Sequence, residues 1–409
     1  MRTVTPTVTP TGRAAVTPRF PALDTLRAVG AFAVLTTHVA FWGGDYTRHG
    51  VGGTVLARLD VGVAIFFVLS GFLLSYPYLA RTRLGLPAPS TGRYLWKRLL
   101  RIYPVYVLTV VAALALVPEN AGTTVSDWLI TLGMGGVFVH PELPHGLTQT
   151  WSLSVEATFY LALPLLMLAA AGRRRLTPAR VLTVLALMVA VDVAWHLRWA
   201  AAVGEHIDGS PLQWLPAFLT WFALGVALAL AHVLHAAGVP AGRVRSALVA
   251  LAQQPGSCWA LAGGVMLLAA TPVAGPTMLA APTPAQSLTK SLLYATVAGL
   301  LVLPGVFPNS RGVFVRLFEL QPLRHLGHIS YGIFCLHLPL LQLVMWVTGY
   351  RLFGGHGVQI WVLTAVVTVA CAEVVYRLVE RPAMGLKNLG RRSSPAAVAT
   401  APAKGSNTR

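Results

Sequence analysis

Apolar residues form blocks that recur along almost the whole chain. Each block is close to the ~20 residues that a helix needs to cross a lipid bilayer. Amphipathic periodicity is weak, which is typical of helices that are apolar on every side. We therefore predict an all-α, polytopic membrane helix bundle with about ten transmembrane helices. The predicted spans are residues 22–42, 61–80, 101–118, 151–171, 180–201, 213–235, 258–273, 287–306, 329–348 and 358–379.

Composition supports a membrane protein. Of the 409 residues, 55% are hydrophobic and 11% are charged, whereas soluble domains carry about 25% charged residues. The net charge of +18 does not indicate nucleic acid binding, because the basic residues cluster in alternate loops. With the N-terminus inside, 25 of the 31 Lys and Arg residues fall in inside segments. This asymmetry predicts that both termini are cytoplasmic and that the partner of the bundle is the lipid bilayer.

The two ends of the chain differ from its middle. Residues 1–20 are rich in Thr and Pro and lack an apolar core segment, so we expect a disordered cytoplasmic tail rather than a signal peptide. Residues 386–409 are expected to form a second disordered tail. Residues 21–385 are then one transmembrane domain, in which no internal repeat is apparent.

The first span carries charged and titratable residues, which are costly inside a membrane and therefore informative. His38 follows Arg27 by eleven residues, which places the two on one helix face, about 16 Å apart in depth. Asp24 lies on that face one turn before Arg27. Asp24 and Arg27 are also compatible with a simple ion pair at a helix end, and His38 with a hydrogen-bonded core histidine. The functional alternative is a polar column that faces a cavity.

The fourth span opens with a polar stripe. Ser152, Glu156 and Tyr160 are spaced by four residues, so they lie on one helix face. Glu156 is expected near the outer membrane surface, at a depth similar to that of His38. Neutral histidine suits general-base chemistry near pH 7, and a carboxylate can orient it. We therefore predict His38 and Glu156 as a catalytic pair; the alternative for Glu156 is stabilisation of the helix dipole.

Arginines gather at the inner end of the bundle. Arg98 and Arg101 follow Arg93 and Lys97 at the start of the third span. Arginine binds phosphate bidentately, so we predict that Arg27, Arg98 and Arg101 hold a phosphorylated donor. The alternative is positive-inside charge that contacts anionic lipid.

Three further features are interpreted as structural. Ser70-Gly71 is expected to let another helix approach closely, in preference to a nucleophilic Ser70. His337, in the middle of the ninth span, is expected to be a core histidine. The pairs His232/His235 and His325/His328 lack a third ligand nearby, so no metal site is predicted.

Six segments together resemble the membrane-bound acyltransferase-3 family, and they occur in order from residue 22 to residue 382. They are Leu23-Asp24…Arg27…His38, the run from Phe66 to Leu73, Arg98…Arg101-Ile102-Tyr103-Pro104, the run from Trp151 to Tyr160, Ser330-Tyr331-Gly332-Ile333-Phe334…His337, and Val379-Glu380-Arg381-Pro382. The resemblance implies a bundle of about ten helices in the bacterial cytoplasmic membrane, with Arg27 and His38 as the essential pair.

The same resemblance implies the reaction. It suggests O-acylation of a hydroxyl on a sugar, glycan, lipid or macrolide, with acyl-CoA as co-substrate and no cofactor or metal. A transporter or flippase is the main alternative, because intramembrane charges also line translocation pathways. A structural or sensory membrane protein is the other. The sequence gives neither the acyl chain, the acceptor nor the oligomeric state.

Overall fold

The computed structural model describes residues 18–172, 176–308 and 312–389, and throughout them the secondary structure is helical or irregular. Within these residues, nine helices are long and apolar enough to cross a membrane, which confirms the predicted all-α polytopic bundle. These spans are Pro21–Gly43, Val51–Arg83, Thr91–Leu116, Thr148–Ala171, Pro178–Gly204, Leu215–Ala236, Pro284–Val306, Gln321–Thr348 and Gly357–Asn388.

The seventh predicted span, 258–273, has a shorter counterpart. It corresponds to α13 (Pro255–Ala269), an apolar helix of 15 residues. At 1.5 Å per residue such a helix is about 22 Å long, and the hydrocarbon core of a bilayer is about 30 Å thick. The other nine predicted spans each have a full-length counterpart.

Most of the predicted tails, and residues 173–175 and 309–311 in two of the loops used to orient the bundle, lie outside the described residues. The described part of the second tail begins with a short 3₁₀ helix, Leu386–Asn388, which continues the last helix. The orientation of the termini across the membrane stays a prediction.

Helix α1 is the element around which the site is built. It packs against α4, α16 and α17, while α4 packs most extensively against α11. Gly327 of α16 contacts the backbone of Asp24 so closely that a Cβ there would clash with the Asp24 carbonyl. A Cβ at Gly71 would likewise clash with the Phe222 carbonyl, which confirms the close helix approach predicted at Ser70-Gly71. The helices concerned are α1 (Pro21–Gly43), α4 (Gly62–Arg83), α11 (Leu219–Ala236), α16 (Gln321–Thr348) and α17 (Gly357–Val375).

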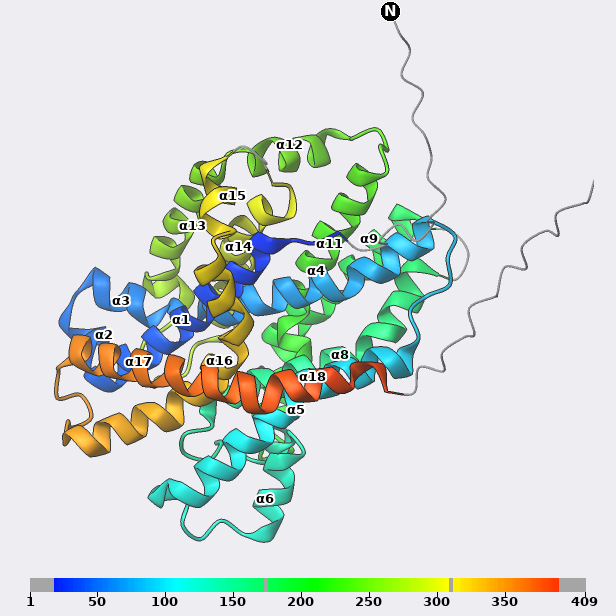
Figure 1. Cartoon of the computed structure of the whole chain (residues 1–409). Helices are drawn as coiled ribbons and strands as arrows, with labels where there is room; N and C mark the ends of the chain where they lie inside the picture. Colours follow the sequence, from blue (N-terminus) through cyan, green and yellow to red (C-terminus); the bar gives the residue numbers. More distant parts are fainter. Residues whose placement is uncertain (1–17, 173–175, 309–311, 390–409) are drawn as a thin grey trace, which may run out of the picture.

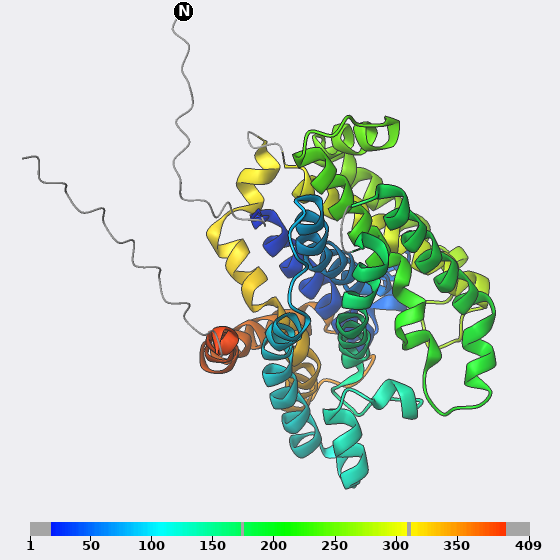
Figure 2. The same cartoon turned by 90° about the vertical axis from the view of Figure 1, so that its right-hand side faces the viewer.

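The last helices form one nearly continuous rod. Helix α17 passes through a π-helical turn, Tyr376–Glu380, into α18 (Arg381–Gly385). In Figure 1 this rod, in orange and red, runs along one side of the bundle beside α5 (Thr91–Leu116). Figure 2 views it almost end-on at the edge of the molecule. The π turn carries Glu380, which is 1% exposed and contacts α5.

Candidate functional site

A cavity of about 330 Å³ lies between α4, α5, α8 (Trp151–Ala171) and α16, and α1 contributes Arg27 to its wall. We call it the arginine cavity. Six of the eight residues predicted for the site line it. They are Arg27, Arg98, Arg101, Ser152, Glu156 and Tyr160. The structure thus brings these six side chains together from three helices, α1, α5 and α8, whereas the sequence had placed them in two separate groups.

Two of the three arginines in the cavity already have carboxylate partners. Asp24 Oδ1 lies 2.6 Å from Nη1 of Arg27, which is the ion pair that the spacing of the first span allowed as an alternative. Arg101 forms an ion pair with the buried carboxylate of Glu380. Because an unpaired charge is costly inside a bundle, these two ion pairs fix Arg27 and Arg101 in place and offset their charge.

Arg98 differs from the other two. Its guanidinium lies over the ring of Tyr160, 5.9 Å from the centroid, and within the described residues no carboxylate lies at ion-pair distance from it. Arg98 also lines a second cavity of about 460 Å³, which shares Leu73 and Leu74 with the first. That second cavity contains three more basic side chains, Arg81, Arg93 and Lys97. Basic side chains therefore line both cavities, and Arg98 is common to the two; we call this run of basic side chains the basic route.

Glu156 has a different partner from the one expected. The hydroxyl of Ser70 donates a hydrogen bond of 2.5 Å to Glu156 Oε1, which ties α4 to α8 inside the arginine cavity. Among the described residues, Glu156 and His38 form no hydrogen bond with each other, and His38 does not line this cavity. The helix contact expected at Ser70-Gly71 is real, but Ser70 also belongs to the site.

His38 pairs with another histidine. Its Nδ1 lies 2.9 Å from Nε2 of His337 on α16, and the two rings are stacked with centroids 5.0 Å apart. His337 is 1% exposed, whereas His38 is only half-buried. Apolar side chains of α1 and α16 surround the pair, among them Leu35 and Ile333. We call these two residues the histidine pair.

An aromatic wall separates the histidine pair from the arginine cavity. Phe66 and Phe334 both line the cavity, and their rings meet edge to face at 5.7 Å. Phe334 lies one turn before His337, with ring centroids 5.9 Å apart. The histidine pair therefore lies directly behind the cavity wall.

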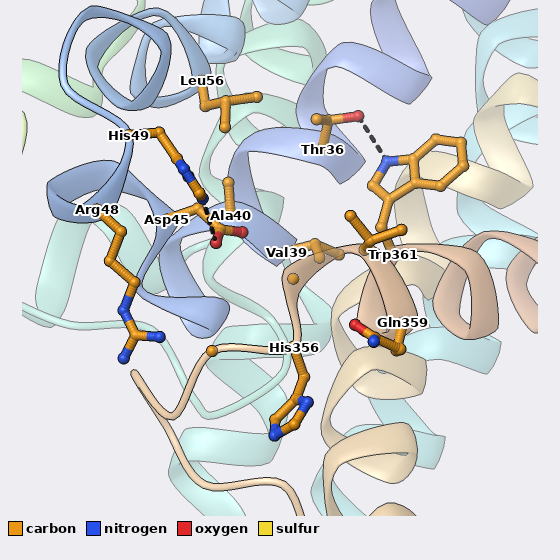
Figure 3. A pocket seen from close by; sticks show the side chains of 13 residues that line it. Thr36, Val39, Ala40, Asp45, Arg48, His49, Leu56, His356, Gln359 and Trp361 are labelled. Atoms are coloured by element: carbon orange, nitrogen blue, oxygen red, sulfur yellow. Dashed lines mark hydrogen bonds and ion pairs between the residues drawn. The ribbon is translucent and has the colours of Figure 1, made fainter.

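A third pocket, of about 620 Å³, lies near the His38 end of α1 (Figure 3). Thr36 of α1 and Trp361 of α17 meet there through a 2.9 Å hydrogen bond, and Asp45 lies 3.3 Å from His49. At 3.6 residues per turn, His38 points about 150° away from the face of α1 that lines this pocket. Helix α1 therefore stands between the pocket and the histidine pair.

Three residues of the site were missed or misread from the sequence. His337 was expected to be a core histidine, Ser70 a helix-contact residue, and Glu380 appeared only within a family motif. A signal existed for His337 and Glu380, because titratable side chains within apolar spans are costly and often functional. Their partners were not readable, since hydropathy does not say which helices are neighbours.

Comparison with known proteins indicates an acyltransferase family. The family model described as "Acyltransferase domain" matches residues 20–377. An acyltransferase of Streptomyces mycarofaciens, MdmB, is 29% identical, covering 94% of this chain and 95% of the relative. Nodulation protein 10 of Rhizobium leguminosarum bv. viciae is 26% identical, with coverage of 89% and 93%.

A relative of greater length also aligns. The putative peptidoglycan O-acetyltransferase YrhL of Bacillus subtilis is 27% identical over 91% of this chain, which spans 56% of that protein. No solved structure matches. Since the family match extends over nearly the whole chain, the protein belongs to the acyltransferase-3 family of membrane acyltransferases.

Proposed function

We propose that this enzyme moves an acyl group from acyl-CoA to a hydroxyl of a sugar, glycan, lipid or macrolide-type acceptor at the cytoplasmic membrane. The observation that carries the proposal is the adjacency of the arginine cavity and the histidine pair across the Phe66–Phe334 wall. One site can hold an anionic donor, and the other can handle a proton.

The donor phosphates bind along the basic route that ends at Arg98. Arg98 has no carboxylate partner among the described residues, so it is available for a bidentate contact with phosphate. Arg27 and Arg101, held by Asp24 and Glu380, complete the positive surface of the cavity. Cytosolic acyl-CoA reaches this end if the termini are cytoplasmic, as the distribution of basic residues predicts.

Acyl transfer takes place where the thioester meets His38. The acceptor oxygen attacks the thioester carbonyl while His38 takes the hydroxyl proton; the C–O bond forms, the C–S bond breaks, and the proton passes to the departing CoA sulfur. His38 is half-buried whereas His337 is almost fully buried, so the acceptor hydroxyl approaches His38. Glu156 and Ser70 lie in the arginine cavity, where the negative charge of the Glu156 carboxylate partly offsets the positive charge of the arginines.

A purified protein in lipid nanodiscs tests the donor. It is mixed with acyl-CoA of graded chain length and with a panel of sugars, glycan fragments and lipids, and release of the CoA thiol is followed. We expect release that depends on an acceptor hydroxyl. Stoichiometric release without acceptor would instead indicate an acyl group carried on the enzyme. If no acyl-CoA binds or turns over, while membranes that contain the protein still acylate an acceptor, the donor is a different molecule.

A further inference from the structure

We infer that His337 is a positioning residue that fixes the tautomer of His38 and leaves His38 Nε2 free to accept the proton of the acceptor. This inference rests on the proposed function, because it assigns the reacting atom of His38. It also explains why a second histidine is buried in the middle of α16.

The tautomer follows from a chain of hydrogen bonds. His337 Nδ1 lies 2.7 Å from the carbonyl oxygen of Phe334 and 3.2 Å from that of Ile333. A carbonyl can only accept, so His337 Nδ1 must carry the hydrogen. A neutral imidazole has a single N–H, so His337 Nε2 is an acceptor. The 2.9 Å contact with His38 then requires an N–H on His38 Nδ1, and His38 Nε2 keeps its lone pair.

The surroundings favour this neutral arrangement. The side chains packed around the two rings are aliphatic or aromatic, and in the described part of the chain no carboxylate lies at ion-pair distance from either histidine. Burying an unpaired charge there would be costly. A charged His337 would also donate from both nitrogens, which would reverse the hydrogen bond and put the proton on the wrong atom of His38.

This arrangement has a consequence for the reaction. When His38 Nε2 takes the proton, the N–H at Nδ1 belongs to an imidazolium, and its bond to His337 becomes charge-assisted and stronger. In serine-protease triads a carboxylate performs the same orienting task. Here a neutral imidazole performs it, which suits a site enclosed by apolar side chains.

A simple core histidine would not need this geometry. The bond to the Phe334 carbonyl already satisfies one nitrogen of His337. The other nitrogen is directed at His38, which comes from a helix 299 residues away in sequence. Such a long-range bond between two titratable side chains is the feature that packing alone leaves unexplained.

Two substitutions of similar volume separate positioning from packing. The amide oxygen of Gln can accept from His38 Nδ1–H, whereas Leu cannot accept at all. We expect His337→Gln to keep kcat within about tenfold and His337→Leu to lower kcat by about 10²–10⁴-fold, in line with loss of an oriented general base. KM for the donor should change less than about threefold in both, because the arginine cavity is untouched.

The tautomer itself can be read directly. In protein labelled with ¹⁵N-histidine in nanodiscs, the His38 signals, assigned with His38→Gln, should show a protonated Nδ1 and an unprotonated Nε2. In His337→Leu the two tautomers should mix. The matched control is His325→Leu on the same helix, since His325 pairs with Glu373 outside both sites; it should leave kcat and the His38 signals unchanged.

Wild-type kcat in His337→Leu would overturn the inference. So would equal losses in the Gln and Leu variants with the His38 tautomer unchanged in both. If the wild-type protein transfers no acyl group, the proposed function fails instead, and the ¹⁵N spectrum still decides whether His337 sets the tautomer.

Discussion

The arginine cavity and the histidine pair lie on opposite sides of one aromatic wall, yet they follow different physical rules. The cavity contains three arginines and a glutamate, and ion pairs neutralise two of the arginines. The histidine pair lies among apolar side chains, and hydrogen bonds alone satisfy it. Ion pairs offset the charge of Arg27 and Arg101 in the first region, whereas among the described residues no carboxylate lies at ion-pair distance from the histidine pair.

The difference suggests a division of labour. A fixed positive charge favours binding of an anionic donor, whereas a neutral base must gain and lose a proton in each turnover. Placing the base in an arginine-rich cavity would oppose that gain, because nearby positive charges disfavour an imidazolium. Helix α1 serves both regions, since Arg27 and His38 are eleven residues, or about 16 Å, apart along it.

The largest effect is expected on the histidine side. His38→Ala should lower kcat by about 10²–10⁴-fold, the usual loss on removing a general base, while donor affinity stays close to that of the wild type. Transfer rates and acyl-CoA binding are measured on the same nanodisc preparation, and an unchanged elution profile serves as the folding control. Transfer at the wild-type rate in His38→Ala would place the base elsewhere.

The next largest effect is expected on the arginine side. Arg98→Gln should raise KM for the donor by about 10–100-fold, since a hydrogen bond to a charged group contributes about 1.5–3 kcal/mol. Its kcat at saturating donor should change much less, because the histidine pair is intact.

The matched control for Arg98 is Arg377→Gln. Arg377 is exposed and bonds to Glu373 outside the cavity, so its loss should leave KM unchanged. If Arg98→Gln and Arg377→Gln have the same donor KM as the wild type, the donor phosphates bind elsewhere.

A smaller effect is expected from the Ser70–Glu156 bond. Glu156→Gln should lower transfer by about tenfold, because a charge-assisted hydrogen bond is roughly twice as strong as a neutral one. Ser70→Ala should cause a similar loss, and the double variant should lose little more than either, since the two act as a unit. Turnover of all four proteins is compared at equal amounts in the membrane. If Ser70→Ala has no effect while Glu156→Gln does, Glu156 acts on another group.

Much of the fold was readable from the sequence because apolar length is a local property. Nine of the ten predicted spans have full-length counterparts. The exception is the span predicted at 258–273, because the apolar sequence continues past Ala269, where helix α13 ends. The Asp24–Arg27 ion pair was one of two interpretations of the first span, and it could be proposed for the same reason: both residues lie on one helix, and the helix repeat fixes their spacing.

The pairing of His38 was not readable, because it depends on how helices are arranged around one another. Expected depth suggested Glu156 as the partner, but depth says nothing about which side of a neighbouring helix a residue faces. Helix α8 packs on α4, which brings Glu156 to Ser70, while α16 packs on α1 and brings His337 to His38. Periodicity places a residue on its own helix, whereas tertiary packing selects its partner.

The smallest expected effect is the coupling between the two regions. If the arginine cavity and the histidine pair act separately, the losses in Glu156→Gln and His337→Gln should multiply in the double variant. Independent sites usually agree with additivity of free energies to about 0.5 kcal/mol, which corresponds to about a twofold deviation in kcat/KM. The experiment compares kcat/KM of the wild type, both single variants and the double variant under one set of conditions. Both substitutions keep a hydrogen-bonding side chain of similar size, so neither is expected to unfold the protein. A deviation from the product of the single losses would then report coupling between the two regions. A double variant that loses tenfold less than the product of the single losses would mean that Glu156 reaches the histidine pair during catalysis, as its predicted depth suggested.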